Sequence, residues 1–266
     1  MHTFSIAGKT ISIFPSIAPG APIFYLNTYA GEGQQVLDAA RAAGCPPFTL
    51  VAISGLNWNR DMAPWDSPAA FKNGEPFTGG AGETLHLLVE EIMPKAEKEL
   101  PRAPEWRGIA GYSLAGLFAL YAIYQTDVFT RVGCISGSLW FPGFLEYVFT
   151  HEPKRRPGCL YFSLGDKEAK TRNPALQTVQ ENTKAVQAFY RKKGIVTMFQ
   201  MNRGNHFIQG AERVADGMKW LLKQGVLAPF GHHELPAQTQ ATRQYKNVTR
   251  GGKARVQASQ AMGRAT

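Results

Sequence analysis

Ser113 stands in a sequence context that could make its hydroxyl a nucleophile. The apolar run Trp106–Gly111 precedes it as a predicted strand, and the apolar residues that follow it predict a helix. Gly111 permits a sharp turn before Ser113, and the small Ala115 and Gly116 let the helix pack closely on the strand. Such a turn exposes the serine Oγ beside a helix N-terminus, where free N–H groups can stabilise an oxyanion. The usual pattern is G-x-S-x-G, and here alanine takes its last position with glycine one residue later.

A nucleophilic serine needs a base within hydrogen-bond reach, and His206 is the candidate. It follows the predicted strand Val196–Met201 on a loop, and open parallel sheets place their sites at the carboxyl ends of strands. In hydrolases with this strand–turn–helix elbow, the chain order is serine, acid, histidine, which His206 fits. The other downstream histidines lie at an expected helix end or near the C-terminus: His151, His232 and His233.

The base in turn needs an orienting carboxylate, which should follow a strand between the serine and the histidine. The predicted strand Leu160–Leu164 is followed by Gly165 and then by Asp166 and Glu168. We prefer Glu168 as the acid, with Asp166 as the alternate acid or as a residue that caps the loop. The remaining alternative is that both carboxylates only solvate the loop.

Two backbone N–H groups would complete an oxyanion hole. We expect one from Leu114, directly after the nucleophile, and the other from Tyr29, in the loop after the strand that ends near Leu26. Trp65 and Trp140 are candidates to line the substrate pocket. Arg60 is a candidate to meet an anionic substrate group. Ordinary core aromatics and a surface arginine explain these three residues equally well.

Composition limits the classes of function. The net charge is +9, but the last 36 residues hold six basic residues against one acidic, Glu234, so +5 lies there and +4 in the first 230. We therefore expect no specific nucleic-acid partner. The three cysteines are too few and too scattered for a disulfide framework or a zinc cluster. The N-terminal residues do not resemble a signal peptide and no run is long enough to span a membrane, which predicts a cytoplasmic protein.

Strands that alternate with helices predict a mostly parallel central sheet with helices on both faces, an α/β fold. A hairpin opens the chain. The predicted strands are Pro22–Asn27, Phe48–Ile53, Trp106–Gly111, Val132–Gly137, Leu160–Leu164 and Val196–Met201; the predicted helices include Gln34–Ala43, Glu83–Leu100, Leu176–Lys193 and Ala211–Gln224. Residues 57–82 form a long segment without periodicity, which is either functional or a surface excursion. Residues 1–230 are expected to form the domain, and 231–266 a basic, disordered tail.

Four segments resemble one family: Gly111–Tyr121, Ser136–Trp140, Gly165–Glu168 and Gly204–Phe207. They are similar to the putative-esterase branch of the α/β-hydrolases, which includes esterase D, feruloyl esterases and bacterial esterases of catecholate siderophores. The stretch Asn59–Trp65 resembles the siderophore-esterase members in particular. The resemblance covers about residues 22–222. It implies the α/β-hydrolase fold, with Ser113 as nucleophile, His206 as base and Glu168 as acid.

These observations predict a serine esterase that cleaves a small-molecule carboxylic ester through an acyl-enzyme, with no metal or organic cofactor. One alternative is an acyltransferase on the same scaffold. Another is a non-catalytic binding protein that kept the hydrolase fold; the serine, acid and histidine in the expected order argue against it. The natural ester and the oligomeric state do not follow from the sequence.

Overall fold

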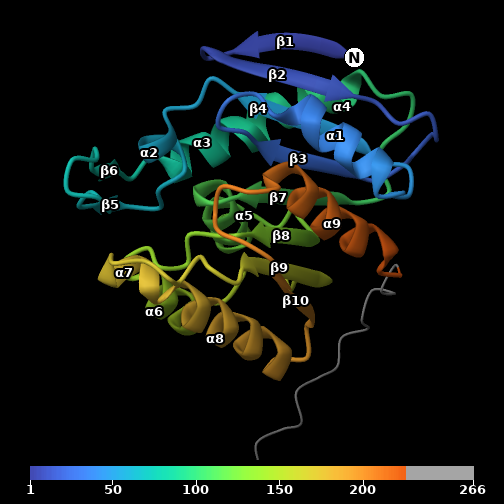
Figure 1. Cartoon of the computed structure of the whole chain (residues 1–266). Coiled ribbons are helices and arrows are strands. Elements are labelled where there is room, and N and C mark those ends of the chain that lie inside the picture. Colours follow the sequence, from blue (N-terminus) through green and yellow to red (C-terminus); the bar gives the residue numbers. More distant parts are fainter. Residues whose placement is uncertain (226–266) are drawn as a thin grey trace, which may run out of the picture. The chain divides into compact units, whose positions relative to one another are not determined.

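One large mixed sheet forms the centre of the fold (Figure 1). The computed structural model describes residues 1–225, within which the strand order is β1-β2-β4-β3-β7-β8-β9-β10. β1 and β2 pair antiparallel, as do β2 and β4, and all other neighbours are parallel. The strands are β1 (His2–Ile6), β2 (Lys9–Phe14), β3 (Ile23–Asn27), β4 (Thr49–Ser54), β7 (Arg107–Tyr112), β8 (Arg131–Ile135), β9 (Cys159–Gly165) and β10 (Val196–Asn202).

The predicted hairpin and the six predicted strands after it are confirmed, each to within two residues at either end. The central strands β3, β8 and β9 are buried along their whole length. A strand that is covered on both faces has a continuous run of apolar residues in its sequence, rather than apolar residues that alternate with polar ones. This is why these segments could be recognised as central strands of a parallel sheet.

Helices cover both faces of the sheet, as predicted. α1 (Gly33–Ala42) and α9 (Gly210–Lys223) lie side by side on one face and share an apolar cluster that includes Val36, Ala40 and Met218 (Figure 1). The helices of the opposite face share the larger apolar cluster: α3 (Ala81–Leu87), α4 (Met93–Lys98), α5 (Leu114–Gln125), α6 (Phe144–Thr150) and α8 (Val179–Lys192). α5 is buried on nearly every side, which explains why its sequence is apolar all round.

Two predicted helices differ in detail. The single helix predicted over Glu83–Leu100 is α3 and α4 joined by a π-helical turn, Leu88–Ile92. Pro94, at the start of α4, has no N–H to donate to the preceding turn, so the regular α-helical ladder could not continue there. The helix predicted over Leu176–Lys193 is α8 preceded by the short α7 (Pro174–Gln177).

The segment without periodicity, residues 57–82, forms a small substructure beside the carboxyl ends of the parallel strands (Figure 1). It contains α2 (Trp58–Asp61) and a two-stranded ribbon of β5 (Asp66–Ser67) and β6 (Phe77–Thr78). Asn173 in front of α7 donates a hydrogen bond to the Ala70 carbonyl of this segment. The segment is therefore an ordered part of the site end of the molecule.

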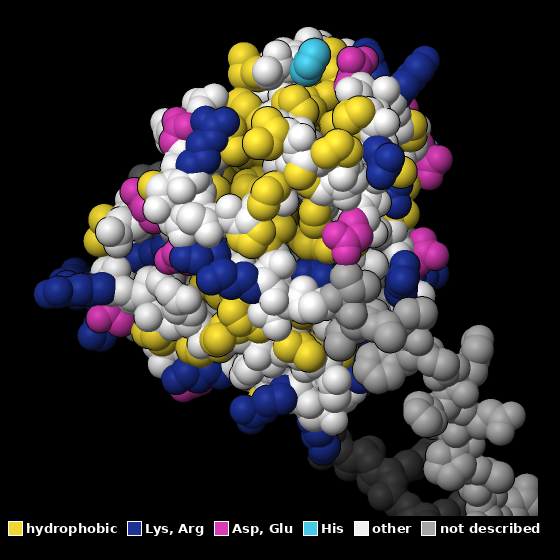
Figure 2. Space-filling view, turned by 90° about the vertical axis from the view of Figure 1, so that its right-hand side faces the viewer, with side chains coloured by type: hydrophobic (Ala, Val, Ile, Leu, Met, Phe, Trp, Pro, Cys, Tyr) yellow, Lys and Arg dark blue, Asp and Glu magenta, His cyan; other side chains and the backbone are white. Residues whose placement is uncertain are grey.

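The opposite end holds the amino ends of the parallel strands. Figure 2 shows this end with hydrophobic side chains gathered over its upper half and Lys and Arg along its lower half and edges. Within residues 1–225, no helix has the length and apolarity needed to cross a bilayer. The predicted boundary near residue 230 and the predicted tail lie outside the described residues.

The cysteine thiols are free, and two of them, Cys134 and Cys159, are buried in strands of the sheet. Burial raises the pKa of Cys159 to about 11 and that of Cys45 to about 11. Because thiols with such pKa values are almost entirely protonated near neutral pH, none of these cysteines is prepared to act as a nucleophile.

Gly111 illustrates how closely β7 and α5 approach each other. A Cβ atom at Gly111 would overlap the backbone carbonyl of Ala115, and one at Gly116 would lie 2.9 Å from the Gly111 carbonyl oxygen. The contact is between backbone atoms, so no side-chain movement can relieve it. The small residues of the elbow are therefore required by packing.

We expect Gly111→Ala to destabilise the protein by about 1–3 kcal/mol or more, because overpacking between rigid backbone segments forces a backbone shift. Urea unfolding followed by circular dichroism measures the change. Gly225→Ala is the matched control, because a Cβ atom there meets nothing within 4 Å. Equal stability of the two variants would contradict the packing argument.

Candidate active site

Ser113 occupies the turn between β7 and α5 in a backbone conformation that non-glycine residues rarely adopt, with φ 60° and ψ −124°. Its N–H donates to the Ile135 carbonyl of β8, at 3.1 Å. Its own carbonyl accepts from Gly116 and Leu117 of α5 and from Ser138. The conformation costs about 1–3 kcal/mol and persists because these bonds hold it from both sides.

His206 lies between Ser113 and Glu168. Its Nε2 is 3.0 Å from Ser113 Oγ, and its Nδ1 is 2.8 Å from Glu168 Oε2. The three residues come from the loops after β7, β9 and β10, all at the carboxyl edge of the sheet. The structure thus brings together the serine, histidine and glutamate that were predicted from the sequence.

Glu168 is nearly buried, with 5% of its side chain exposed. Its Oε1 accepts hydrogen bonds from the Gly165 N–H at 2.6 Å and the Ser136 hydroxyl at 2.8 Å, and from Arg213. Burial on its own raises the pKa of Glu168, but the hydrogen bond and charge of His206, with the Gly165 and Ser136 donors, outweigh it and lower the pKa. Glu168 is therefore a carboxylate near neutral pH.

Asp166, the alternate acid, hydrogen-bonds to the backbone, whereas the His206 imidazole hydrogen-bonds to Glu168. Its Oδ1 accepts from the Gly204 N–H at 2.7 Å, and its own N–H donates to the Asn202 carbonyl. These bonds tie the loop after β9 to the loop after β10. Asp166 has the loop-capping geometry that the sequence left open for it.

The predicted oxyanion donors lie at the ends of neighbouring strands. Leu114 is the first residue of α5, so its N–H has no partner within the helix. Tyr29 follows β3, which pairs with β7 up to the Asn27–Gly111 register, so its backbone lies near the elbow. The Tyr29 side chain is 69% exposed and packs edge-to-face on Trp58.

A cavity of about 450 Å³ opens over Ser113 and His206. Trp140 lines it, as predicted. Trp65 and Arg60 do not: the Trp65 ring packs among Phe141, Phe144 and Tyr147. The Arg60 guanidinium pairs with Asp61 and Glu83. The substrate contacts predicted for Trp65 and Arg60 are therefore not supported: Trp65 Nε1 donates to the Pro142 carbonyl, and the Arg60 guanidinium already has two carboxylate partners.

A family model described as putative esterase matches residues 26–250 of this chain. The chain belongs to the putative esterase family. A relative, the uncharacterized protein YbbA of Bacillus subtilis (strain 168), is 26% identical over 182 residues, which cover 66% of this chain and 73% of YbbA.

Solved structures share the fold. An IroE-like serine hydrolase from Shewanella oneidensis superposes with a TM-score of 0.67 at 21% identity, covering 81% of this chain and 76% of that protein. The siderophore hydrolase EstA from Aspergillus nidulans gives a TM-score of 0.64 at 18% identity, covering 83% and 93%. The fold is thus that of the α/β-hydrolases, and this member of the esterase family is a carboxylic ester hydrolase, as the sequence predicted.

Several residues of the site were not foreseen. Two lysines close to Glu168 in the chain line the cavity, Lys167 and Lys170. Phe71 and Phe207 also line it and are 60% and 91% exposed. Lys167 lies between the two candidate acids, Asp166 and Glu168, so its position in the sequence was a signal for a basic residue at the site. The phenylalanines carry no sequence signal, because exposure is set by the tertiary fold.

Three further residues were not predicted from the sequence: Arg213 and Ser136, which donate to Glu168, and Tyr112, which donates to the His206 carbonyl. The signal for Arg213 is a charged residue on the apolar face of α9, next to the buried Val214 and Gly217. A fully buried arginine needs partners, so its position pointed to a polar site beneath the helix.

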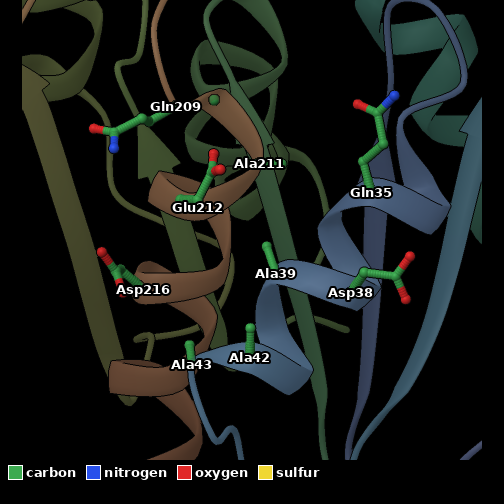
Figure 3. A pocket seen from close by; sticks show the side chains of 10 residues that line it. Gln35, Asp38, Ala39, Ala42, Ala43, Gln209, Ala211, Glu212 and Asp216 are labelled. Carbon is green, nitrogen blue, oxygen red and sulfur yellow. The ribbon is translucent and has the colours of Figure 1, made fainter.

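A second cavity of about 760 Å³ lies between α1 and α9, on the other face of the sheet. Figure 3 shows its lining of alanines with the acidic Asp38, Glu212 and Asp216 at its sides. It contains no nucleophile. Among the described residues, no group of three or more His, Cys, Asp or Glu side chains could hold a metal ion.

The lowered pKa of Glu168 makes the stability depend on pH. Because the folded-state pKa lies below that of the unfolded chain, the carboxylate stabilises the folded protein above pH ~4.3. This contribution is lost as the pH falls from there towards the folded-state pKa. We expect Glu168→Gln to show a shallower loss of unfolding free energy over this range than wild type, measured by urea unfolding. Glu181→Gln, at an exposed acid of α8, is the control, and an equal slope for Glu168→Gln and wild type would contradict the assignment.

Proposed function

We propose that the protein hydrolyses its ester through a Ser113-His206-Glu168 triad and an acyl-enzyme. The observation that carries the proposal is the continuous chain of hydrogen bonds from Ser113 Oγ through the imidazole to Glu168. Ser113 Oγ attacks the ester carbonyl while His206 Nε2 takes its proton. The same proton then passes to the leaving alkoxide, and the C–O bond of the ester breaks.

Deacylation repeats these steps with water. His206 removes a proton from the water that attacks the acyl-enzyme, and Ser113 leaves with that proton. Glu168 holds Nδ1–H of the imidazole and stabilises its positive charge in both steps. The N–H groups of Leu114 and Tyr29 are the proposed donors to the oxyanion, and each is worth about 100-fold or more in rate.

For the substrate, we propose an ester that carries aromatic and anionic groups, as in the lactones of catecholate siderophores. Trp58, Phe71 and Trp140 give the cavity an aromatic wall. Lys167 and Lys170 lie at the same cavity with no ion-pair partner among residues 1–225, so they are available to an anionic group. The fold that the chain shares with a siderophore hydrolase agrees with this choice.

We expect Ser113→Ala to abolish hydrolysis of p-nitrophenyl butyrate and labelling by a fluorophosphonate, because both reactions need the serine Oγ. Glu168→Gln should lower kcat by about 100-fold or more, since the imidazole loses its orienting charge, whereas Asp166→Asn should change it far less. Steady-state kinetics on folded variants measure these values.

Ser5→Ala, on the exposed side of β1, is the control for Ser113→Ala. Retained activity in Ser113→Ala would remove this serine from the mechanism. A larger loss in Asp166→Asn than in Glu168→Gln would transfer the role of the acid to Asp166.

The substrate proposal predicts that Lys167→Ala/Lys170→Ala lowers kcat/KM about 10-fold or more for a ferric catecholate lactone, because two charge-assisted contacts are lost. The same variant should hydrolyse neutral p-nitrophenyl butyrate within about 2-fold of wild type. Lys184→Ala, at an exposed lysine of α8, is the matched control. Equal losses on the charged and neutral esters would refute recognition of an anion by these lysines.

A further inference from the structure

Arg213 is a buried cation beneath the proposed triad. It lies in the first turn of α9, only 2% of the residue is exposed, and its guanidinium points towards the carboxyl edge of the sheet. One side of the guanidinium, Nη1, donates to Glu168 Oε1 at 2.9 Å, and it also lies 3.2 Å from the Ser136 and Tyr112 hydroxyls. Arg213 therefore contacts the acid and the ends of two strands at once.

The other side of the guanidinium holds the loop of the base. Nη2 donates to the Asn205 carbonyl at 2.9 Å and to the Arg203 carbonyl at 3.2 Å. The carbonyl of His206 itself accepts from the Tyr112 hydroxyl at 2.7 Å. Burial, the largest cause, raises the pKa of Tyr112, so this phenol keeps the proton that it donates. Consecutive carbonyls at the base are thus fixed by Arg213 and Tyr112.

The two carboxylate oxygens of Glu168 have different hydrogen-bond partners. Oε1 receives every fixed donor, namely the Gly165 N–H, the Ser136 hydroxyl and Arg213. Oε2 is left for His206 Nδ1. A rigid planar guanidinium can hold a carboxylate and two carbonyls in one fixed geometry, which a lysine ammonium cannot.

We propose that Arg213, assisted by Tyr112, is a positioning residue that sets the Glu168–His206 hydrogen bond. The proposal rests on the proposed triad and goes beyond it, because it assigns the alignment of acid and base to a side chain outside the triad. Arg213 acts through both partners: Nη1 fixes the carboxylate and Nη2 fixes the backbone that carries the imidazole.

Burying Arg213 costs free energy of folding, which argues that this residue does more than stabilise the protein. Arg213 Nε is buried without a hydrogen-bond partner, and such a donor costs about 1–3 kcal/mol. Another buried arginine, Arg131, contacts the same helix at its far end through the Leu221 carbonyl. Arg131 offers a natural comparison, because it is a buried arginine anchored to α9 but distant from the site.

The test compares Arg213→Lys and Arg131→Lys in the full chain, with steady-state kinetics on p-nitrophenyl butyrate and thermal unfolding. We expect Arg213→Lys to lower kcat about 10- to 100-fold with KM within about 2-fold, since misalignment of a catalytic pair acts on the chemical step. Arg131→Lys should lower the melting temperature but keep kcat within about 2-fold of wild type. Unchanged kcat in a folded Arg213→Lys variant would overturn the proposal.

A double-mutant cycle separates positioning from a general structural role. If Arg213 acts through the Glu168–His206 bond, most of its effect on kcat should vanish once Glu168→Gln has already weakened that bond. A structural role would give the same fold-loss in both backgrounds, and that result would overturn the proposal.

If Arg213→Lys does not fold, Tyr112→Phe tests the same alignment of Glu168 and His206, because Tyr112 also holds the backbone at His206. It removes only the hydroxyl that holds the His206 carbonyl, and we expect a several-fold loss of kcat with unchanged KM. Wild-type kcat in folded Tyr112→Phe would then overturn the proposal. Failure of the proposed function looks different: wild type itself would neither cleave esters nor react with a fluorophosphonate.

Discussion

The strained backbone at Ser113 is the constraint on which the rest of the site depends. A serine at φ 60° and ψ −124° turns the chain sharply from β7 into α5 at the carboxyl edge of the sheet. That conformation survives because Ile135 of β8, Gly116 and Leu117 of α5, and Ser138 all hydrogen-bond to the residue. Gly111 and Gly116 let these elements approach closely enough to do so. The core packing and the catalytic geometry therefore have the same cause.

The sequence predicted what local patterns and chain order determine. Continuous apolar runs indicated the parallel strands, and the spacing of serine, acid and histidine along alternating strands placed them at one edge. The choice between Asp166 and Glu168 was harder, because two residues on a tight loop differ in direction rather than in position. The contacts favour Glu168 as the proposed acid, because Asp166 Oδ1 accepts from the Gly204 N–H whereas Glu168 Oε2 lies 2.8 Å from His206 Nδ1.

Tertiary partners explain what the sequence could not supply. Arg60 looked available to a substrate, but Glu83, 23 residues further along the chain, pairs with it. Trp65 looked like a pocket residue, but α6 covers it. Arg213 follows Glu168 by 45 residues, and only the packing of α9 on the sheet brings the two together. Each of these depends on a contact between distant segments that no local pattern encodes.

Charge balance links Arg213 to the chemistry of the triad. With a neutral imidazole, Arg213 and Glu168 form a buried pair of zero net charge, so the carboxylate is not an unpaired buried anion. In the proposed mechanism, His206 takes the serine proton, and the cluster gains one positive charge at the moment when the ester oxygen gains one negative charge. The two new charges lie across Ser113 from each other and attract in a partly dehydrated cavity, where such attraction is stronger than in water. Without Arg213, the new charge of the imidazolium would only offset the charge of the Glu168 carboxylate, and the oxyanion would have no net positive charge to balance it. With the buried arginine, the site therefore has zero net charge both in the resting protein and when the oxyanion forms.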